Sequence, residues 1–327
     1  MSVISIILCT RDRARDLSKT LESIAQVQMP VRHSVELLVV DNGSRDQTAE
    51  VVKQWHSPVG MEVHYVYVGT PGKGYAYNAG IREAKGDILL FTDDDVRFPD
   101  HWIEGMVAPI ENGQADAVAG GVRIAPHLMR PWLTQYMREC YASTEGINPL
   151  QPERMVGANM GFHRRILAVI PGFDENIGPG SKYGLHDETL FSWQLVEHGF
   201  RLVSAFHVEV EHHFTPDRLC SCSMMKNAYR LGVSDGYVTW HWNQIGPDRY
   251  RHDLAVILWR ALPRLPRLLW LAISKKEYPI QEEELKFVRK LFFLLQYNLE
   301  THGPPCYPFK GSVKISLQSN RTRNSNK

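Results

Sequence analysis

Apolar runs rich in β-branched residues recur at short intervals in the first hundred residues. Such runs are typical of strands that are buried on both faces of a parallel sheet. They occur at 3–10 (VISIILCT), 35–42 (VELLVVDN), 62–68 (EVHYVYV) and 87–95 (DILLFTDDD). The stretches between them carry apolar residues at helical spacing, as at Leu17, Leu21 and Ile24. This alternation predicts an α/β fold with a doubly wound, mostly parallel sheet.

The composition narrows the class of protein. The 327-residue chain is 43% hydrophobic, which is enough for a sizeable core. It carries 37 Lys and Arg against 36 Asp and Glu, and this balance excludes the strongly basic class of nucleic-acid-binding proteins. Its five cysteines include no CxxC pair, which favours a reducing compartment over a disulfide-stabilised fold. The N-terminal run lacks the basic start of a signal peptide, and no stretch is long enough for a membrane span. We therefore expect a cytoplasmic protein.

Three of the four predicted strands end in polar residues. Thr10 and Arg11 end the first strand, Asp41 ends the second, and the acidic run 93–95 ends the fourth. In doubly wound sheets, ligands bind beyond the carboxyl ends of the strands. We expect these side chains to line one ligand site.

A glycine-rich stretch, GTPGKGYAYN at 69–78, precedes the third predicted helix. Its glycines would let the backbone approach a ligand, and Lys73 can meet a phosphate or a base. A tight turn into the helix explains the stretch equally well. No GxGxxG follows the first strand and no GxxxxGK[ST] occurs, so the usual dinucleotide and P-loop sites are excluded.

Three consecutive carboxylates, Asp93, Asp94 and Asp95, close the fourth run. Mg²⁺ and Mn²⁺ commonly bridge protein carboxylates and substrate phosphates. On an extended segment Asp93 and Asp95 point to one side and Asp94 to the other. A solvated turn near the next helix would also explain an isolated acidic run. The two other polar strand ends favour a cation site.

At this point several blocks of the chain resemble the family-2 glycosyltransferases with the A-type fold. The blocks are ILCTRDRARDLSKTLESI, LLVVDNGSRDQT, GKGYAYNAGIREAKGDILLFTDDDV and VGANMGFHRRIL followed by IPGFDENIG. They occur in the order and spacing of the family, from about residue 3 to about residue 213. The resemblance implies a nucleotide-sugar donor, a divalent metal (Mn²⁺ or Mg²⁺) held by the acidic run, and transfer with inversion at the anomeric carbon.

The resemblance assigns roles position by position. Asp93 would contact the ribose and the metal, and Asp95 would bind the metal directly. The cation would offset the charge of a diphosphate and stabilise it as a leaving group. The residues that would contact the nucleotide sugar are Thr10, Arg11, Asp41, Gly72, Lys73, Asn78, Asp93 and Asp94.

An acid pair, Asp187–Glu188, stands where the family has its catalytic base. The family usually shows Glu-Asp there, and the second acid is normally the base. The order is swapped in this chain, and Gln194 stands where an Arg is common. By register Glu188 is the base, and Asp187 is the alternative. An inverting transfer needs one carboxylate to take the proton of the acceptor hydroxyl. Capping of the following helix is the structural alternative for the pair.

Two adjacent histidines occur in VEVEHHF at 208–214. Metal-binding members of the family often place a His at this strand end. His212 is therefore the predicted further metal ligand, and His213, one position later, is the alternative ligand. Imidazole suits Mn²⁺. A polar strand end is the structural alternative for the histidines. A zinc site that adds Cys220 and Cys222 is disfavoured, because their spacing is not that of zinc ligands.

The chain beyond residue 216 no longer resembles the family. Residues 219–242 predict one helix that is broken near Gly232 and Gly236, and residues 283–299 predict another amphipathic helix. The tail, which includes SLQSNRTRNSNK, is predicted to be flexible. The predicted domains are 1–215 (catalytic, divided near 125 into a nucleotide-sugar half and an acceptor half from 126), 216–305 (helical extension) and 306–327 (tail).

The segment 252–276 has an unusual composition. It carries Trp259 and Trp270 among leucines, and Arg260, Arg264 and Arg267 share one helical face. Such a segment can lie in a membrane interface, which would make the protein peripheral at the cytoplasmic membrane face. A helix that is kinked by its prolines and docked on the catalytic domain is the alternative.

These features predict a metal-dependent inverting glycosyltransferase that moves a sugar from a nucleotide-diphosphate sugar to a glycan, lipid-linked or other hydroxyl acceptor. The alternative is a non-catalytic nucleotide-sugar or glycan-binding module of the same fold. A nucleotidyltransferase is disfavoured, because its glycine-rich N-terminal signature is absent from LCTRDRARDL. No nucleic-acid partner is expected, and a homo-oligomer is compatible with the sequence.

Overall fold

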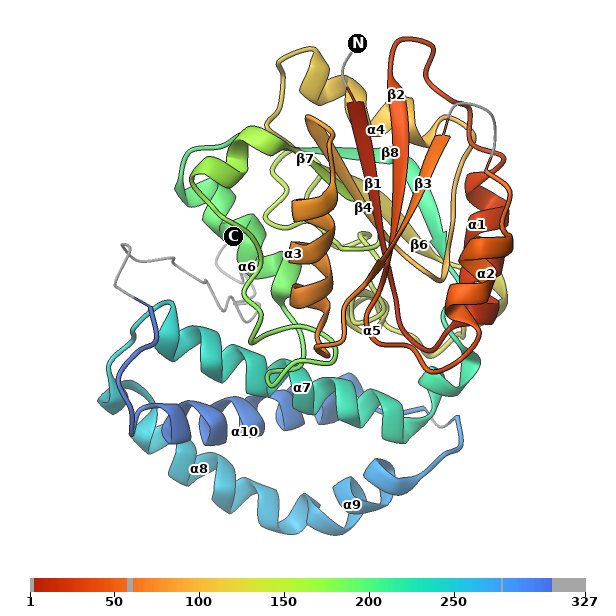
Figure 1. Ribbon diagram of the computed structural model, residues 1–327. Coiled ribbons are helices and arrows are strands. Elements are labelled where there is room, and N and C mark those ends of the chain that lie inside the picture. Colours follow the sequence, from red (N-terminus) through yellow and green to blue (C-terminus); the bar gives the residue numbers. More distant parts are fainter. Residues whose placement is uncertain (1–2, 58–60, 278, 308–327) are drawn as a thin grey trace, which may run out of the picture.

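The structure is a computed structural model that describes residues 3–57, 61–277 and 279–307 (Figure 1). An eight-stranded sheet with the order β3-β2-β1-β4-β7-β6-β8-β5 forms its centre. The strands are β1 (Val3–Thr10), β2 (Ser34–Asp41), β3 (Met61–Tyr67), β4 (Ile88–Asp93), β5 (Val96–Arg97), β6 (Ala117–Ile124), β7 (Met160–His163) and β8 (Leu202–His212). The helices are α1 (Ala14–Ile24), α2 (Thr48–Gln54), α3 (Lys73–Glu83), α4 (Trp102–Glu111), α5 (Gln135–Glu139), α6 (Asp187–Glu197), α7 (Ser221–His241), α8 (Arg251–Ala261), α9 (Leu265–Ile273) and α10 (Glu282–Glu300).

The first half of the sheet is parallel. β1 pairs in parallel with β2 and β4, and β2 pairs in parallel with β3. β7 is antiparallel to both β4 and β6, and β6 is parallel to β8. The four strands expected from the apolar runs are present, and the predicted α/β fold with a mostly parallel sheet is confirmed.

Helices cover both faces of the sheet, which is why the early strands are apolar on both sides. Ile6 of β1 lies in one apolar layer with Leu21 of α1, while its neighbour Ile7 lies in the other layer with Tyr77 of α3. All four side chains are fully buried. Successive residues of a strand point to opposite faces, so one apolar run supplies both layers.

The C-terminal helices form a separate layer beside the sheet, in which α7 and α10 pack along each other (Figure 1). The expected break in α7 is wrong, because the helix is continuous from Ser221 to His241. Its two glycines serve a close helix contact instead. A Cβ on Gly232 would lie 2.3 Å from the carbonyl oxygen of Arg289, and one on Gly236 would lie 2.8 Å from the backbone nitrogen of Tyr297.

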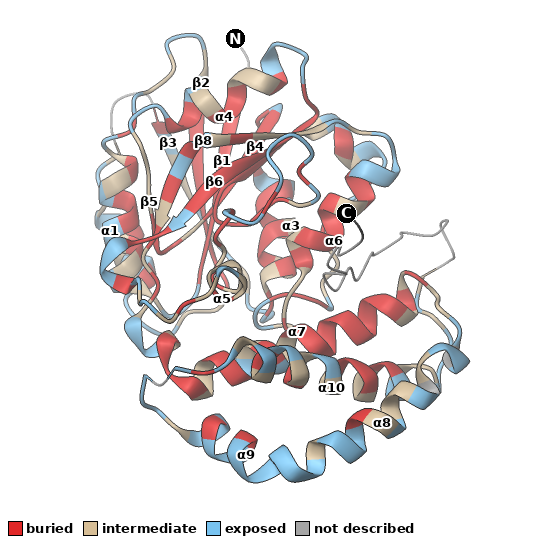
Figure 2. Cartoon of the chain, turned by 180° about the vertical axis from the view of Figure 1, so that it is seen from behind, coloured by how far each residue is buried: buried red, intermediate tan, exposed pale blue. Residues whose placement is uncertain are grey.

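The segment predicted as a kinked helix is α8 and α9, joined by a short 3-10 turn at Leu262–Arg264. The two helices curve around the outside of the α7–α10 layer (Figures 1 and 2). Two arginines of the segment contact residues of α10. The guanidinium of Arg264 lies 5.1 Å from the ring centroid of Phe287, and Arg267 is ion-paired with Glu284. Two of the three arginines therefore turn toward α10, while Arg260 is exposed.

Among the helices that the structure describes, none combines the length and the apolar content that crossing a bilayer requires. The predicted flexible tail lies outside the described residues from 308 onward. The helical character of the C-terminal extension is confirmed, and the domain limits stay a prediction.

Candidate active site

The strand register brings the predicted site residues to one edge of the sheet. Thr10 at the end of β1 pairs with Asp41 of β2, and Cys9 pairs with Asp93 of β4. β1 runs from the N-terminus toward the α7–α10 layer, so this carboxyl edge faces that layer (Figure 1). Parallel strands place their carboxyl ends together, as the sequence predicted.

Asp41 is buried at this edge and is held in place on both oxygens. It accepts a hydrogen bond from the backbone N–H of Ser44 at 2.7 Å and one from the hydroxyl of Tyr65 at 2.6 Å. Burial and the charge of Asp41 raise the pKa of Tyr65 far above its usual value. Tyr65 therefore stays a hydrogen-bond donor to Asp41 at neutral pH.

Asn42, the next residue, ties the glycine-rich loop to the end of β2. Its amide accepts from the N–H of Gly72 at 2.8 Å and donates to the carbonyl of Thr70 at 2.7 Å. Asn42 was not among the predicted site residues, although it stands at a polar strand end. Gly72 has φ +137, and a Cβ there would lie 2.5 Å from Oγ of Ser181, so only glycine fits this crossing of two loops.

Lys73 connects the glycine-rich loop to the acidic run. Its Nζ lies 2.6 Å from Oδ1 of Asp93, and its backbone N–H donates to the carbonyl of Pro179 at 2.9 Å. Burial alone would lower the pKa of Lys73, but the carboxylates of Asp93, Glu188 and Asp187 raise it well above its usual value. Lys73 is thus a permanent cation between the acidic run and the acid pair.

Asp94 points into the protein, away from this lysine. It accepts hydrogen bonds from Thr10 Oγ1 at 2.8 Å and Arg13 Nη1 at 2.9 Å, and its carbonyl accepts from Thr20 at 2.6 Å. Burial and the charge of Asp95 raise the pKa of Asp94 to about 7, against the opposing effect of Arg13. These bonds hold the strand end together, and a contact between Asp94 and the nucleotide stays a prediction.

Arg13 is a site residue that the sequence reasoning missed. Its guanidinium also lies 2.7 Å from Oδ2 of Asp95, so it balances two carboxylates of the run. The sequence did indicate that such a residue exists, because three adjacent carboxylates at a buried strand end require nearby cations. A second such cation is Arg218, 4.0 Å from Asp95.

Asp95 and His212 form the pair that is best suited to hold a cation. His212 Nε2 lies 3.2 Å from Asp95 Oδ1, and both side chains are buried. His212 Nδ1 lies 2.7 Å from the carbonyl oxygen of Tyr141, which can only accept, so Nδ1 carries a proton. This leaves Nε2 directed at Asp95. Burial alone would raise the pKa of Asp95, but His212 and Arg13 hold it far below its usual value.

The donor set fits a divalent cation in part. An ionised carboxylate and an oriented imidazole are ligands for Mn²⁺ or Mg²⁺, and substrate phosphates commonly complete the coordination. Asp93, the third predicted ligand, is bonded to Lys73 and does not converge on the other two. In the described part of the chain, three such ligand atoms lie within 4.8 Å of one another only at Glu36, Glu62 and His64, toward the amino ends of β2 and β3.

His213 turns away from the acidic run. Its Nε2 lies 3.0 Å from Glu211, and only its backbone N–H contacts Asp95, at 2.7 Å from the carbonyl. Cys220 and Cys222 lie beside each other at the start of α7. Within the described residues, their side chains do not gather with those of His212 and His213 into a metal-binding group. The geometry thus favours His212 over His213 and does not assemble the disfavoured zinc site.

The acid pair at the start of α6 has two different environments. Asp187 is 1% exposed, and neither of its oxygens has a hydrogen-bond partner among the described residues, while Glu188 is partly exposed. Burial and then the charge of Glu188 raise the pKa of Asp187 well above its usual value. Burial alone would raise the pKa of Glu188 as well, but Asp187 and Lys73 lower it. Of the two acids, Asp187 therefore has the higher pKa, and Glu188 is the one that ionises first.

A network from the C-terminal helices holds the start of α6. His186 has the left-handed φ of +79 and lies 3.1 Å from Asp235 of α7, which accepts a bidentate pair of hydrogen bonds from Arg289 of α10 at 2.6 and 3.0 Å. None of these residues was predicted, since their meeting depends on packing between distant helices. The helical extension thus positions the acid pair.

Comparison with known protein families identifies the family of this chain. The family model of glycosyl transferase family 2 matches residues 5–170, about half of the chain. The chain belongs to this family. It is therefore a glycosyltransferase, as the motifs implied, and this favours an enzyme over a non-catalytic module of the same fold.

Two relatives of this glycosyltransferase come from Haloferax volcanii. Glycosyltransferase AglE is 31% identical over 119 residues, which cover 36% of this chain and 39% of AglE. Glucosyl-dolichyl phosphate glucuronosyltransferase is 26% identical over 267 residues, which cover 78% of this chain and 83% of the relative. The chain thus spans less than half of AglE and most of the second relative.

Solved structures support the A-type fold. The mannosyltransferase PcManGT from Pyrobaculum calidifontis superposes with a TM-score of 0.57 at 18% identity, covering 91% of this chain and 86% of that chain. Staphylococcus aureus TarS 1–349 superposes with a TM-score of 0.51 at 14% identity, covering 92% and 90%. At these identities the similarity shows the fold alone.

Two predicted donor-binding residues of the glycosyltransferase lie at the margin of the site. The amide of Asn78 accepts from the N–H of Phe173 at 2.9 Å and donates to its carbonyl at 3.0 Å. Its structural role is therefore to hold the loop after β7. Arg11 is half-exposed, 3.7 Å from Asp12, at the rim of the β1 end. Contacts between these two residues and a nucleotide stay predictions.

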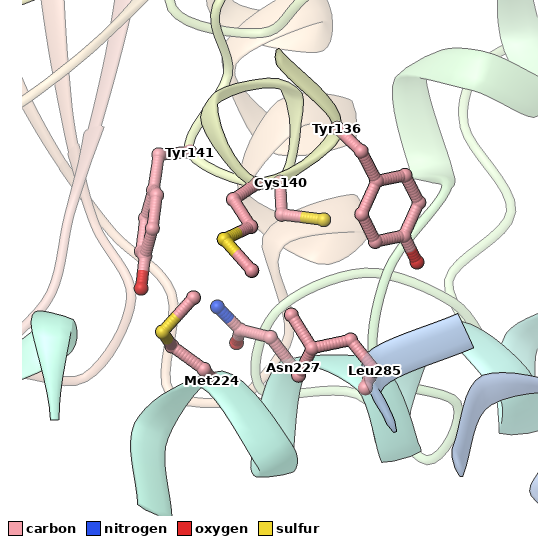
Figure 3. A pocket seen from close by; sticks show the side chains of 8 residues that line it. Tyr136, Cys140, Tyr141, Met224, Asn227 and Leu285 are labelled. Atoms are coloured by element: carbon pink, nitrogen blue, oxygen red, sulfur yellow. The ribbon is translucent and has the colours of Figure 1, made fainter. Parts of the chain in front are cut away.

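The helical extension packs directly onto the acceptor half beside the His212 site. Figure 3 shows Tyr136 and Cys140 facing Asn227 of α7 and Leu285 of α10 around a cavity of about 10 Å³. This volume holds roughly one water molecule. Tyr141, whose carbonyl orients His212, also lines the cavity. The packing of α7 and α10 thus supports both His212 and the acid pair.

Proposed function

We propose that this glycosyltransferase transfers a sugar with inversion from a nucleotide-diphosphate sugar to an acceptor hydroxyl, with a divalent cation at Asp95 and His212. One observation carries the proposal. A buried Asp187 with a raised pKa stands next to a partly exposed Glu188 with a lowered pKa, and both lie close enough to the Lys73–Asp93 pair to raise the pKa of Lys73. This arrangement supports the assignment of a base and a fixed cation to the same strand edge.

Glu188 is the residue best suited to act as the base. Its exposure lets an acceptor reach it, and its lowered pKa keeps it ionised at neutral pH. It would take the proton of the acceptor hydroxyl while that oxygen bonds to C1 of the sugar. The C1–O bond to the diphosphate breaks in the same step, and its electron pair leaves with the diphosphate. Attack from the opposite side of C1 inverts the anomeric configuration.

Asp187 would serve as a positioning and hydrogen-bonding group. A buried carboxyl group without a partner is uncommon and marks a place where a ligand or a water supplies the missing bond. Its raised pKa favours a protonated form, in which Asp187 would donate a hydrogen bond to an acceptor or sugar oxygen while Glu188 takes the proton of the acceptor hydroxyl.

The donor would lie along the edge formed by Asp41, the Gly72 loop and Asp93. Lys73 would add positive charge near the departing diphosphate, which stabilises the charge that develops there. A bound Mg²⁺ or Mn²⁺ would supply further Lewis-acid stabilisation of that group. Two neighbours in structure support this assignment, because PcManGT was solved with GDP-Man and Mn²⁺ and TarS 1–349 with UDP.

The acceptor is proposed to be a glycan or a lipid-linked sugar. The Haloferax relative whose alignment covers most of this chain is, by its name, a glucuronosyltransferase acting on glucosyl-dolichyl phosphate. A lipid-linked acceptor is therefore the first class to test.

A donor screen tests the proposal. The purified chain is incubated with a panel of nucleotide sugars and Mn²⁺ or Mg²⁺, and release of nucleoside diphosphate is measured with and without EDTA. We expect one donor to be hydrolysed slowly without acceptor and used faster with it, and NMR of the product to show the inverted anomer. A product that retains the donor anomer would contradict the inverting mechanism. Full activity in EDTA would contradict the metal site.

A further inference from the structure

The helices α8 and α9 carry several exposed apolar side chains. Trp259 and Ile273 are each 75% exposed, and Leu262 is 67% exposed. Most of the two helices is exposed, with short buried stretches (Figure 2). Exposed apolar surfaces of this extent mark an interaction site. We call the following exposed side chains the apolar ridge: Leu258, Trp259, Leu262, Leu265, Leu269, Trp270 and Ile273.

The ridge is a second apolar face, distinct from the one that packs on the protein. Leu258, Leu262, Leu265 and Leu269 recur at helical spacing, so they share one side. Leu268 and Leu271 are instead buried in a cluster with residues of α7 and α10. Leu268 and Leu271 thus anchor α9 on the protein, while the ridge side chains remain exposed to solvent.

The charge of the same segment selects the kind of partner. Residues 254–276 contain no Asp or Glu, but they contain five basic residues. Arg264 and Arg267 contact α10, while Arg260, Lys275 and Lys276 are exposed beside the ridge. An apolar face bordered by cations, with tryptophans among the leucines, matches the interface of an anionic bilayer.

We propose that α8 and α9 dock this glycosyltransferase on an anionic lipid bilayer. The ridge enters the headgroup region with the helices parallel to the surface, and Arg260, Lys275 and Lys276 contact lipid phosphates. A second copy of the chain is a less suitable occupant. A two-fold interface through this face would oppose the same basic residues, without an acid in the segment to pair with them.

The position of the apolar ridge determines how the candidate active site would be oriented when the protein docks on a bilayer. The α7–α10 layer lies at the carboxyl edge of the sheet, and α8 and α9 lie on the outer side of this layer (Figure 1). Docking would thus turn the catalytic edge toward the bilayer. The inference that a lipid-linked acceptor is met there rests on the proposed function, whereas the docking itself does not.

Vesicle flotation with the full chain tests the docking. The probes are phosphatidylcholine vesicles with and without about one third phosphatidylglycerol, at low and at moderate salt. We expect binding to the anionic vesicles only, weaker at moderate salt because exposed charges are screened. Donor hydrolysis is measured in parallel on the same samples, so a failure of docking and a failure of the proposed function are seen separately.

Two variants separate the apolar and the basic contributions. Arg260→Glu/Lys275→Glu/Lys276→Glu should lower the partition coefficient by at least about 100-fold, since each basic residue near an anionic surface strengthens binding several-fold. Its matched control is Arg15→Glu/Arg32→Glu/Lys53→Glu, which makes the same charge change at exposed positions of the catalytic domain. That control should lose much less binding.

The apolar contribution is tested by Trp259→Ser/Leu262→Ser/Ile273→Ser. This variant should lose binding at both salt concentrations, while Val31→Ser/Leu150→Ser, at two side chains that are each 93% exposed, should bind like the unchanged chain. Donor hydrolysis should be unchanged in all four variants. Unchanged chain that stays unbound with anionic vesicles at both salts overturns the proposal. So does a concentration-dependent dimer in sedimentation that the ridge variant abolishes, because the ridge would then be an interface between copies.

Discussion

Nε2 of His212 lies 3.2 Å from Oδ1 of Asp95, although the two residues come from opposite halves of the catalytic domain. The ring is oriented from its other side, where Nδ1 donates to the carbonyl of Tyr141 at 2.7 Å. His213, the next residue, turns its ring toward Glu211. The chain thus offers one histidine aimed at the acidic run and an adjacent one that serves as a matched control.

His212→Ala should raise the Mn²⁺ concentration needed for half-maximal transfer by at least about 10-fold, since even the indirect partners of metal ligands contribute that much to affinity. His213→Ala should leave it nearly unchanged. The measurements are transfer rates over a Mn²⁺ titration and Mn²⁺ binding by electron paramagnetic resonance in the presence of a nucleoside diphosphate. Equal effects of the two substitutions would remove His212 from the metal site.

Glu188→Gln should lower kcat by at least about 100-fold, because the base acts in the transition state, and should leave the Kd of the nucleotide sugar nearly intact. Asp187→Asn should be milder, because the raised pKa of Asp187 favours a hydrogen-bond donor there and an amide can still donate. Both constants can be measured by single-turnover kinetics and calorimetry. The opposite ranking would make Asp187 the base.

The pH profile gives an independent check on the same pair. A base must be deprotonated, so activity falls as the pH falls through its pKa. The pKa of Glu188 is below its usual value of 4.5, whereas the pKa of Asp187 is well above its usual value of 3.8. With Glu188 as base, kcat/KM should show no acid limb from this pair between about pH 5 and 7. An acid limb near neutral pH that Asp187→Asn removes would contradict the assignment.

Asp235→Asn should lower the free energy of unfolding by about 3 kcal/mol at neutral pH, since it removes one partner of a buried ion pair. Burial alone would raise the pKa of Asp235, but Arg289 and His186 lower it far below its usual value. A depressed pKa stabilises the fold above the unfolded-state pKa and loses this effect as the pH falls. The difference from the unchanged chain should therefore be constant above about pH 5 and shrink below about pH 4.

Denaturant unfolding between pH 3 and 8 measures this difference. Glu197→Gln, at the exposed far end of α6, is the control and should show little change. Because Asp235 bonds to His186, just before the acid pair, Asp235→Asn should also lower kcat more than it raises KM. A pure loss of stability with unchanged kcat in the folded fraction would show that Asp235 does not position the acid pair.

Gly232→Ala should destabilise the fold even though alanine favours helices. Its new Cβ would lie 2.3 Å from a backbone oxygen of α10, which cannot move aside as a flexible side chain could. Overpacking of this kind costs roughly 1–3 kcal/mol, against about 1 kcal/mol gained in helix propensity. Thermal unfolding should show a lower Tm than for Gly246→Ala, where a Cβ meets nothing within 4 Å. Equal Tm values would contradict the close α7–α10 contact.

The core of the catalytic domain was predictable because its signals are local. A strand such as β1, apolar on both faces, must be covered by helices on both sides, and parallel strands must end together at one edge. Thr10, Asp41 and Asp93 could therefore be placed at one site from the chain alone. The glycine-rich loop and the acidic run also follow each other in the order typical of the family, which made the resemblance recognisable from the sequence.

The C-terminal layer was predictable only as a set of helices. The pair Gly232 and Gly236 predicts a helix break when propensity is considered alone, yet the approach of α10 makes it a close packing surface within one continuous helix. Likewise, the arginine face of 252–276 was visible in the sequence, but only the packing of α9 on α10 shows that the apolar ridge faces outward.

The amino-acid sequence by itself determined the fold class, the edge of the sheet that carries the site, and the residue types gathered there. Tertiary structure decided which histidine faces Asp95, which acid of the pair has the higher pKa, and that Arg13 and Arg289 balance buried carboxylates. The physical reason is that burial and charge pairing depend on residues brought together from distant parts of the chain. A pKa or a ligand direction is a property of that assembled environment, while strand and helix periodicity are already present in each short segment.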